Sequence, residues 1–215
     1  MRQIYNKYDK KLIAALPREV FEGKIVVVLN DGEAERAVSF LLSQDILGID
    51  TETRPSFRPG QQHKVALLQV STTDVCFLFR LNSLGLSPAV RRLLEDTTTP
   101  KIGLSLKDDL MMLHRLGDFT PGNFIDLQDH VSEIGVEDMS LQKLYANFFG
   151  KKISKREQLS NWEADILSDK QKLYAATDAW ACIRLFGELQ SLKSTNNFNL
   201  VKVIDDVQTD NTEKR

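Results

Sequence analysis

Apolar and polar positions follow two different periods along this chain. Short runs of apolar and β-branched residues, bounded by turn-forming residues, predict strands at 25–29, 46–53, 65–71, 75–81, 101–104 and 124–127. Stretches in which apolar residues recur every three or four positions predict helices at 33–42, 87–95, 106–116, 140–149 and 168–192. Strands therefore alternate with helices, except at one place where two strands follow each other directly.

The connections between these elements predict a mixed sheet. Residues 72–74 form a turn too short for a crossover, so the strands beside it should make an antiparallel hairpin. The other strands are separated by helices, which favours parallel pairing. We expect one α/β domain at 25–192, with a five- to six-stranded mixed sheet and helices on both faces. An N-terminal extension should cover 1–24, and a C-terminal tail, partly disordered and frayed after Val207, should cover 193–215.

The charge balance limits the kind of contact that the protein can make with nucleic acid. The 215 residues carry 28 basic and 30 acidic side chains, a formal net charge of −2. A protein that holds nucleic acid along a long track usually has a basic excess, so any such contact should be short and local. Cys76 and Cys182 lie in apolar runs and should be reduced core thiols. The charged N-terminus and the lack of long apolar stretches predict a cytoplasmic protein without membrane contact.

Two carboxylates stand in the predicted strand at 46–53. Side chains alternate along a strand, so Asp50 and Glu52 should point to the same face, while Ile49 and Thr51 point to the other. Two neighbouring acids on a buried strand repel each other and lose hydration, which a divalent cation between them would offset. The alternative is that the strand ends at Ile49 and that both acids are solvated.

A second polar pair lies within the long helix predicted at 168–192. Tyr174 and Asp178 are four residues apart and share a helix face. Their neighbours are mostly alanines and larger apolar residues, so Asp178 does not lie on an ordinary solvated face. The small side chains would let this helix approach the sheet closely. The alternative is a buried aspartate that Tyr174 or a backbone group satisfies.

A third acidic position lies where the predicted strand at 101–104 enters a helix. Asp108 and Asp109 both occur in the first helical turn, where the helix dipole favours acids. Asp109 shares a helix face with apolar residues, which gives it a slight preference, and from the residues alone both Asp108 and Asp109 stay candidates. Together, the acids of three separate segments and one tyrosine are the components of a two-metal phosphodiesterase site, whose oxygen ligands favour Mg²⁺ or Mn²⁺.

These motifs resemble those of the DEDD exonuclease superfamily, and in particular the branch of ribonuclease D and the Werner syndrome exonuclease domain. Asp50-Thr51-Glu52 is similar to the first motif, 101–109 to the second, and Tyr174 with Asp178 to the tyrosine form of the third. Segments at 55–57, 65–71, 126–128 and 158–180 are similar as well. The resemblance implies a ribonuclease H-like fold and 3′→5′ hydrolysis of DNA or RNA that releases nucleoside 5′-monophosphates.

The resemblance also implies roles for individual residues. Asp50, Glu52, Asp109 and Asp178 would bind two divalent ions, Mg²⁺ or Mn²⁺, and Tyr174 would position the attacking water. The partner would be single-stranded or 3′-recessed DNA or RNA, and no obligate protein partner is evident. The alternatives are a catalytically silent nucleic-acid-binding module of the same fold and an endonuclease.

Candidate contacts to nucleic acid lie in two basic segments. One begins at Thr51 in the first motif and continues through Arg54, Phe57, Arg58 and Lys64; the other precedes Trp162 and includes Lys151, Lys152, Lys155 and Arg156. Cations in these segments would contact phosphates, and Phe57 would stack on a base. The alternative for each segment is a solubilising surface patch, and Trp162 is expected in the core.

Overall fold

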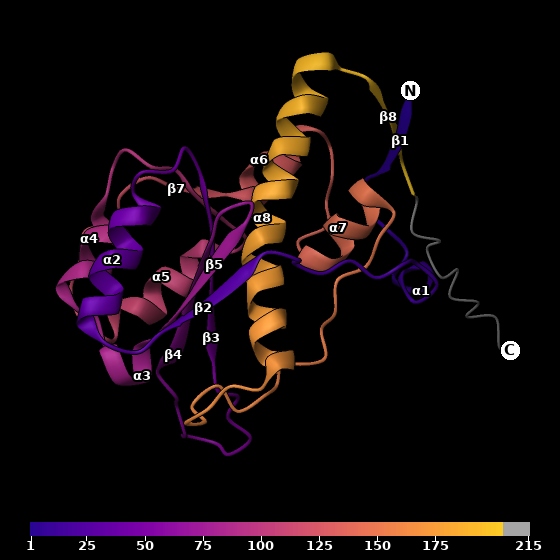
Figure 1. Cartoon of the computed structure of the whole chain (residues 1–215). Helices are drawn as coiled ribbons and strands as arrows, with labels where there is room; N and C mark the ends of the chain where they lie inside the picture. The colour runs from indigo at the N-terminus through magenta and orange to yellow at the C-terminus, as the bar shows by residue number, and fades with distance from the viewer. Residues whose placement is uncertain (204–215) are drawn as a thin grey trace, which may run out of the picture.

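A computed structural model, which describes residues 1–203, has the layered α/β architecture shown in Figure 1. The central sheet has the strand order β2-β5-β4-β3-β6-β7, with the bounds Lys24–Val28, Val75–Arg80, Val65–Ser71, Leu47–Thr53, Lys101–Gly103 and Phe124–Asp126 in that order. β4 pairs antiparallel with both β3 and β5, and the other neighbours pair parallel. The predicted mixed sheet is therefore confirmed. The predicted frayed tail after Val207 lies outside the described residues.

Helices cover both faces of this sheet, as predicted (Figure 1). One apolar cluster joins one face to α2, α3, α4 and α5, and a second joins the other face to α6, α7 and α8. The helix bounds are Lys10–Ile13 (α1), Asp31–Leu41 (α2), Leu81–Leu84 (α3), Pro88–Glu95 (α4), Leu106–His114 (α5), Leu127–Glu133 (α6), Leu141–Phe149 (α7) and Asp169–Thr195 (α8). The short helices α1, α3 and α6 were not predicted, since so few residues show no helical period.

Both cysteines, Cys76 and Cys182, are free and buried, as predicted. Trp162 is fully buried and belongs to the core, also as predicted. Within residues 1–203, no helix combines the length and the hydrophobicity that crossing a bilayer requires.

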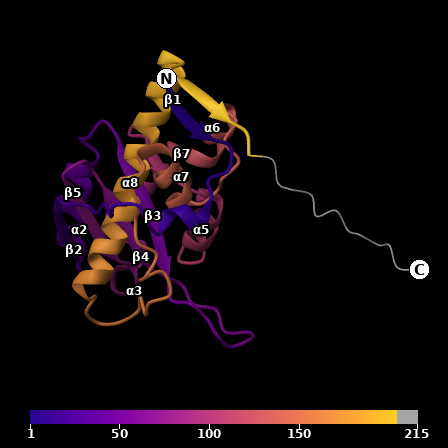
Figure 2. The same cartoon turned by 90° about the vertical axis from the view of Figure 1, so that its right-hand side faces the viewer.

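The two ends of the described chain meet beside this sheet (Figure 2). β1, Arg2–Tyr5, pairs parallel with β8, Phe198–Val201, in a separate two-stranded sheet. The side chain of Asn147 in α7 accepts a hydrogen bond from the backbone N–H of Tyr5 at 2.9 Å and donates one to its carbonyl at 2.7 Å. Neither short strand was predicted, because each depends on a partner at the opposite end of the chain.

The central strand β3 and helix α8 approach each other at backbone distance. A Cβ atom placed on Gly48 would lie 1.9 Å from the carbonyl oxygen of Ala179. The buried Ala175 and Ala176 of α8 keep the same interface thin. Glycine at position 48 is therefore required by this contact, and it sets the separation between the carboxylates of β3 and those of α8.

Substitution of Gly48 tests this contact. Gly48→Ala should lower the free energy of unfolding by about 1–3 kcal/mol, because the added methyl group must displace α8. Gly187→Ala in α8 is the matched control, because a Cβ there meets nothing within 4 Å. This control substitution should stabilise the protein by up to about 1 kcal/mol. Urea unfolding measures both, and equal effects of the two substitutions would contradict the close approach.

Candidate active site

β3 presents different residues to the two faces of the sheet. Gly48 faces α8, and by the alternation of a strand Asp50 and Glu52 face the same way. Leu47 and Ile49 belong to the opposite apolar cluster, which includes α5, and Thr51 shares their side. This arrangement confirms that Asp50 and Glu52 share one face, and it places Thr51 toward α5.

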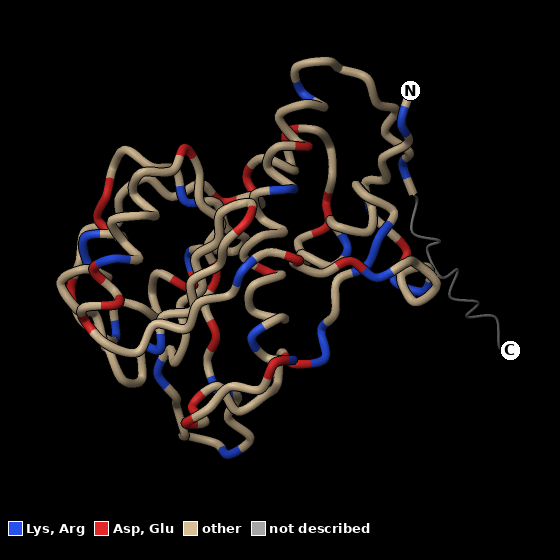
Figure 3. The backbone as a smooth tube through the Cα atoms, viewed as in Figure 1, with Lys and Arg blue, Asp and Glu red and all other residues tan. Residues whose placement is uncertain are grey.

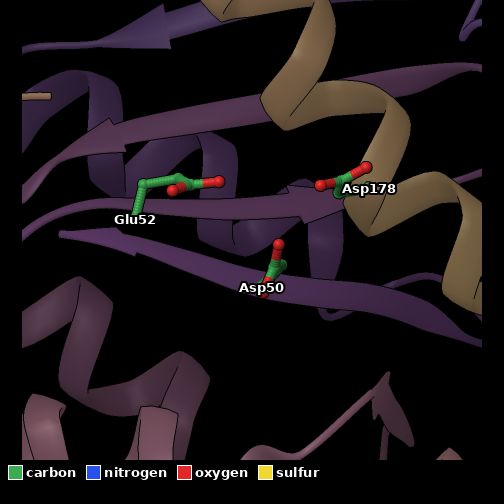
Figure 4. A group of neighbouring side chains, drawn as sticks. All are labelled: Asp50, Glu52 and Asp178. Carbon is green, nitrogen blue, oxygen red and sulfur yellow. The ribbon is translucent and has the colours of Figure 1, made fainter. Parts of the chain in front are cut away.

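Three carboxylates converge between β3 and α8 (Figure 4). Asp50 and Glu52 come from β3 and Asp178 comes from α8, and each offers an oxygen within 4.8 Å of the others. Glu52 and Asp178 are only 8% and 7% exposed. The sequence motifs that contain these acids are more than a hundred positions apart, and packing of α8 on β3 brings them together.

Burial and mutual repulsion disfavour the charged forms of these three acids. Burial and the neighbouring carboxylates Asp109 and Asp178 hold the pKa of Asp50 well above its ordinary range. Burial, together with Asp50 and Asp178, raises the pKa of Glu52 to about 10. Burial raises the pKa of Asp178 to about 7, although Tyr174 and Lys155 oppose the shift. The side chains around these three acids therefore do not offset the repulsion among their charged forms.

Two polar side chains contact these carboxylates. The Nε2 of Gln69, in the neighbouring strand β4, donates to Oδ2 of Asp50 at 3.3 Å. Tyr174 lies one helical turn from Asp178 in α8 and opposes the rise in the pKa of that carboxyl. Burial and the adjacent Asp178 and Glu52 raise the pKa of Tyr174 far above its ordinary value, so this phenol keeps its proton. Gln69 was not predicted, although a polar residue inside the apolar strand at 65–71 is a usable signal.

Asp109 approaches the cluster from α5, on the other side of β3. Its Oδ1 accepts a short hydrogen bond from the hydroxyl of Thr51, whereas Asp108 is exposed to solvent. Burial raises the pKa of Asp109 to about 6, and the bond from Thr51 opposes the shift. The carboxylate of Asp109 lies outside the group of three that meet within 4.8 Å, but it is close enough to Asp50 to raise its pKa.

The start of α5, and with it the position of Asp109, depends on Asp126 at the end of β7. The carboxylate of Asp126 accepts hydrogen bonds from the backbone N–H groups of Ser105 at 3.0 Å, Leu106 at 2.8 Å and Gln128 at 2.9 Å. Ser105 has a left-handed backbone with φ of +62°, which is unfavourable outside glycine. Gln128 also donates a short bond to the Ser105 hydroxyl. Asp126 therefore stabilises a strained turn.

No role was predicted for Asp126, even though an aspartate between a strand and a helix is a typical N-cap. The sequence gives no sign that Asp126 also has a second role, at the start of another helix. One carboxylate caps α6 through Gln128 and at the same time fixes the start of α5, which is twenty residues earlier in the chain. Only the parallel pairing of β6 with β7 brings these two helix starts together.

The carboxylates open onto a cleft of about 330 Å³. Asp50, Thr51, Glu52, Tyr174 and Asp178 line it, and Lys155, from the segment after α7, lines it as well. The Nζ of Lys155 lies 3.2 Å from the hydroxyl of Ser140 at the start of α7. Lys151 lies elsewhere: its Nζ is 2.7 Å from the carboxylate of Glu19.

The other predicted nucleic-acid contacts line a second, separate cleft. Arg54, Phe57 and Arg58 lie in the loop after β3, which faces 159–161 across this cleft, and Lys64 is exposed at the end of the same loop. Phe57 is 80% exposed. Arg54 contacts Glu163 at 3.2 Å, and Nδ1 of His63 lies 2.8 Å from the same carboxylate. These contacts join the two loops at the lower end of the molecule in Figure 1.

The group of carboxylates fits a hard divalent cation. Its donors are all oxygen atoms, which Mg²⁺ and Mn²⁺ prefer. Within the described chain, Oδ1 of Asp178 is buried and has no hydrogen-bond partner, and a buried acceptor in that state is costly. A cation beside it would satisfy this atom and remove the repulsion among Asp50, Glu52 and Asp178.

Comparisons with known proteins agree with this site. A 3′-5′ exonuclease family model matches residues 25–193. The bifunctional 3′-5′ exonuclease/ATP-dependent helicase WRN of Mus musculus is 32% identical over 190 residues, which is 84% of this chain but only 14% of the mouse protein. The chain belongs to the 3′-5′ exonuclease family, which confirms the resemblance to the ribonuclease D and Werner exonuclease branch.

Solved structures of low sequence identity share the fold. The Nibbler EXO domain of Aedes aegypti superposes with a TM-score of 0.74 at 19% identity, covering 84% of this chain and 95% of that one. Trypanosoma brucei RNase D in complex with the RNA U12 has a TM-score of 0.69 at 21% identity, covering 79% and 63%. The predicted ribonuclease H-like fold is thus confirmed.

The raised pKa values predict how the stability of the metal-free protein depends on pH. Unfolded Asp and Glu titrate near pH 4, while folded Asp109, Asp178 and Glu52 titrate at about 6, 7 and 10. The folded state therefore binds more protons across this window, and the free energy of unfolding in EDTA should fall as the pH rises from about 5 to 8. Glu52→Gln should reduce the slope, and Mn²⁺ should reduce it in the wild type. Urea unfolding measures the slope; a flat or rising curve in EDTA would contradict the raised pKa values.

Substitution of Asp126 tests its role in the strained turn. Asp126→Asn replaces one acceptor oxygen with a donor, so at least one of three backbone N–H groups is left without its partner. The free energy of unfolding should fall by about 1–3 kcal/mol. Asp129→Asn is the matched control, because Asp129 is an exposed acid in the first turn of α6 and should cost at most about 1 kcal/mol. Equal effects in chemical denaturation would show that Asp126 has no special role.

Proposed function

We propose that this protein is a metal-dependent 3′→5′ exonuclease that hydrolyses the terminal phosphodiester bond of DNA or RNA and releases nucleoside 5′-monophosphates. The observation that carries the proposal is the meeting of Asp50, Glu52 and Asp178 within 4.8 Å at the base of an open cleft. A catalytically silent module would have no need to keep three largely buried, mutually repelling acids, and the full set of motif residues is present.

Asp50, Glu52 and Asp178 would hold one divalent cation, and Asp109 together with Asp50 would hold a second. The bound cations would lower the pKa of a water molecule and stabilise negative charge on the phosphate and on the departing 3′ oxygen. Gln69 would keep Asp50 oriented through its amide, and Thr51 would do the same for Asp109. Lys155, which lines the same cleft, would attract a phosphate of the substrate.

Tyr174 would orient the attacking water rather than take its proton. It lines the same cleft as Asp178, and its raised pKa keeps the phenol neutral. The oxygen of the water bonds to phosphorus, and the bond from phosphorus to the 3′ oxygen of the preceding nucleotide breaks. The products are the terminal nucleoside 5′-monophosphate and a strand that is shorter by one residue with a new 3′-hydroxyl.

Degradation of end-labelled substrates tests this function. Wild-type protein should shorten 5′-labelled strands from the 3′ end with Mg²⁺ or Mn²⁺ and not with EDTA. Asp50→Asn should lower kcat by about 10²-fold or more, since a cation site is removed. Asp45→Asn, which changes an exposed acid just before β3, should not change kcat.

The choice of substrates separates the alternatives. Single-stranded DNA, single-stranded RNA and a 3′-recessed duplex rank the preference for sugar and for strandedness, and circular single-stranded DNA should stay intact. Cleavage of the circle would indicate an endonuclease. If wild-type protein degrades none of the linear substrates in either metal while still binding them, the silent module replaces the enzyme.

A further inference from the structure

A basic groove continues the catalytic cleft on the side of α7. Four cations line this groove of about 270 Å³, namely Arg18, Lys152, Lys155 and Arg156, and within the described residues no carboxylate does. Among those residues, none of the four forms an ion pair, although Lys152 donates a hydrogen bond to a backbone carbonyl. The formal charge of the protein is −2, so this concentration of positive charge is local.

The groove and the catalytic cleft share one wall. Gln142, Ile153, Ser154 and Lys155 line both of them. The side chain of Gln142 donates to the carbonyl of Ile153 at 2.8 Å, which ties α7 to the segment that carries the cations. The groove is therefore adjacent to the cleft in which a terminal phosphate would meet the carboxylates.

Part of this groove comes from outside the residues that the family model matches. Arg18 precedes residues 25–193, which the family model matches. The backbone of its segment is joined to Lys152: the N–H of Glu19 donates to the carbonyl of Lys152 at 2.9 Å, and the N–H of Lys152 donates to the carbonyl of Pro17 at 2.9 Å. Figure 3 shows basic positions in both of these neighbouring segments.

We propose that this groove binds the phosphates of the substrate strand behind its 3′ end, and that Arg18, Lys152 and Arg156 set the path by which single-stranded nucleic acid leaves the active site. The groove has this role only if the chain is the exonuclease proposed above. The partner is a single strand because a groove lined by cations beside the catalytic cleft can follow a flexible phosphate backbone.

The structure favours this path over the cleft after β3. Arg54 in that cleft is already paired with Glu163, and the cleft shares no lining residue with the catalytic one. Lys151 is likewise neutralised by Glu19. Charge that is already paired contributes less to phosphate binding, because the pair must be broken or shared.

Binding of single strands to the full chain tests the path without relying on turnover. Every protein in the assay carries Asp50→Asn, and anisotropy of a 5′-labelled oligonucleotide reports affinity for strands from the dinucleotide upward. Adding Arg18→Glu and Arg156→Glu should weaken binding of long strands several-fold and that of the dinucleotide less. The slope of log affinity against log salt should fall by about 0.7 for each phosphate that the variant no longer neutralises.

Two further charge reversals serve as comparisons. Arg36→Glu on α2, exposed on the opposite face of the sheet, should leave affinity and salt slope unchanged. Arg58→Glu should weaken long-strand binding less than Arg18→Glu. The proposed path is wrong if Arg18→Glu and Arg156→Glu bind long strands like the parent, or if Arg58→Glu alone weakens the binding.

The same proteins without Asp50→Asn separate the two proposals. If degradation persists while the groove variants bind normally, the path is wrong and the enzyme stands. If wild-type protein degrades nothing while the groove variants bind weakly, the groove is a nucleic-acid site and the enzyme assignment is wrong.

Discussion

Three largely buried carboxylates that repel one another are held together by the contact between β3 and α8. Gly48 and the alanines of α8 let the two backbones approach so closely that Asp178 lies beside Asp50 and Glu52. The folding of the sheet and the packing of α8 stabilise this arrangement at the expense of desolvating the charges. Buried carboxylates whose pKa values are strongly raised tend to occur at functional sites. Hard divalent cations are the species that would relieve the repulsion among these three.

The second half of the site is built by a different mechanism. Asp109 is not on the face that carries the other acids, and its contact with β3 is the hydrogen bond from Thr51, beyond the two residues of β3 that pair with β6. Its helix starts at a left-handed serine that Asp126 holds in place. The two parts can therefore vary separately: one depends on close packing and the other on a hydrogen-bonded turn.

Substrate recognition, as proposed, is linked to the ends of the chain rather than to the sheet. The segment before β2 supplies Arg18 and is joined by backbone hydrogen bonds to the segment after α7. β1 and β8 pair with each other beside α7. Residues outside the range that the family model matches thus contact the segment that borders the catalytic cleft.

The sequence by itself determined the elements and most of the chemistry. The two-residue period of β3 predicted that Asp50 and Glu52 share a face, and the four-residue spacing placed Tyr174 beside Asp178, because both are local properties of a strand and a helix. Tertiary structure decided what depends on distant partners: the contact of Asp109 with Thr51, the role of Asp126 at two helix starts, the pairing of β1 with β8, and the ion pair between Lys151 and Glu19. Local periodicity cannot show these contacts, because each joins segments that only the packed sheet brings together.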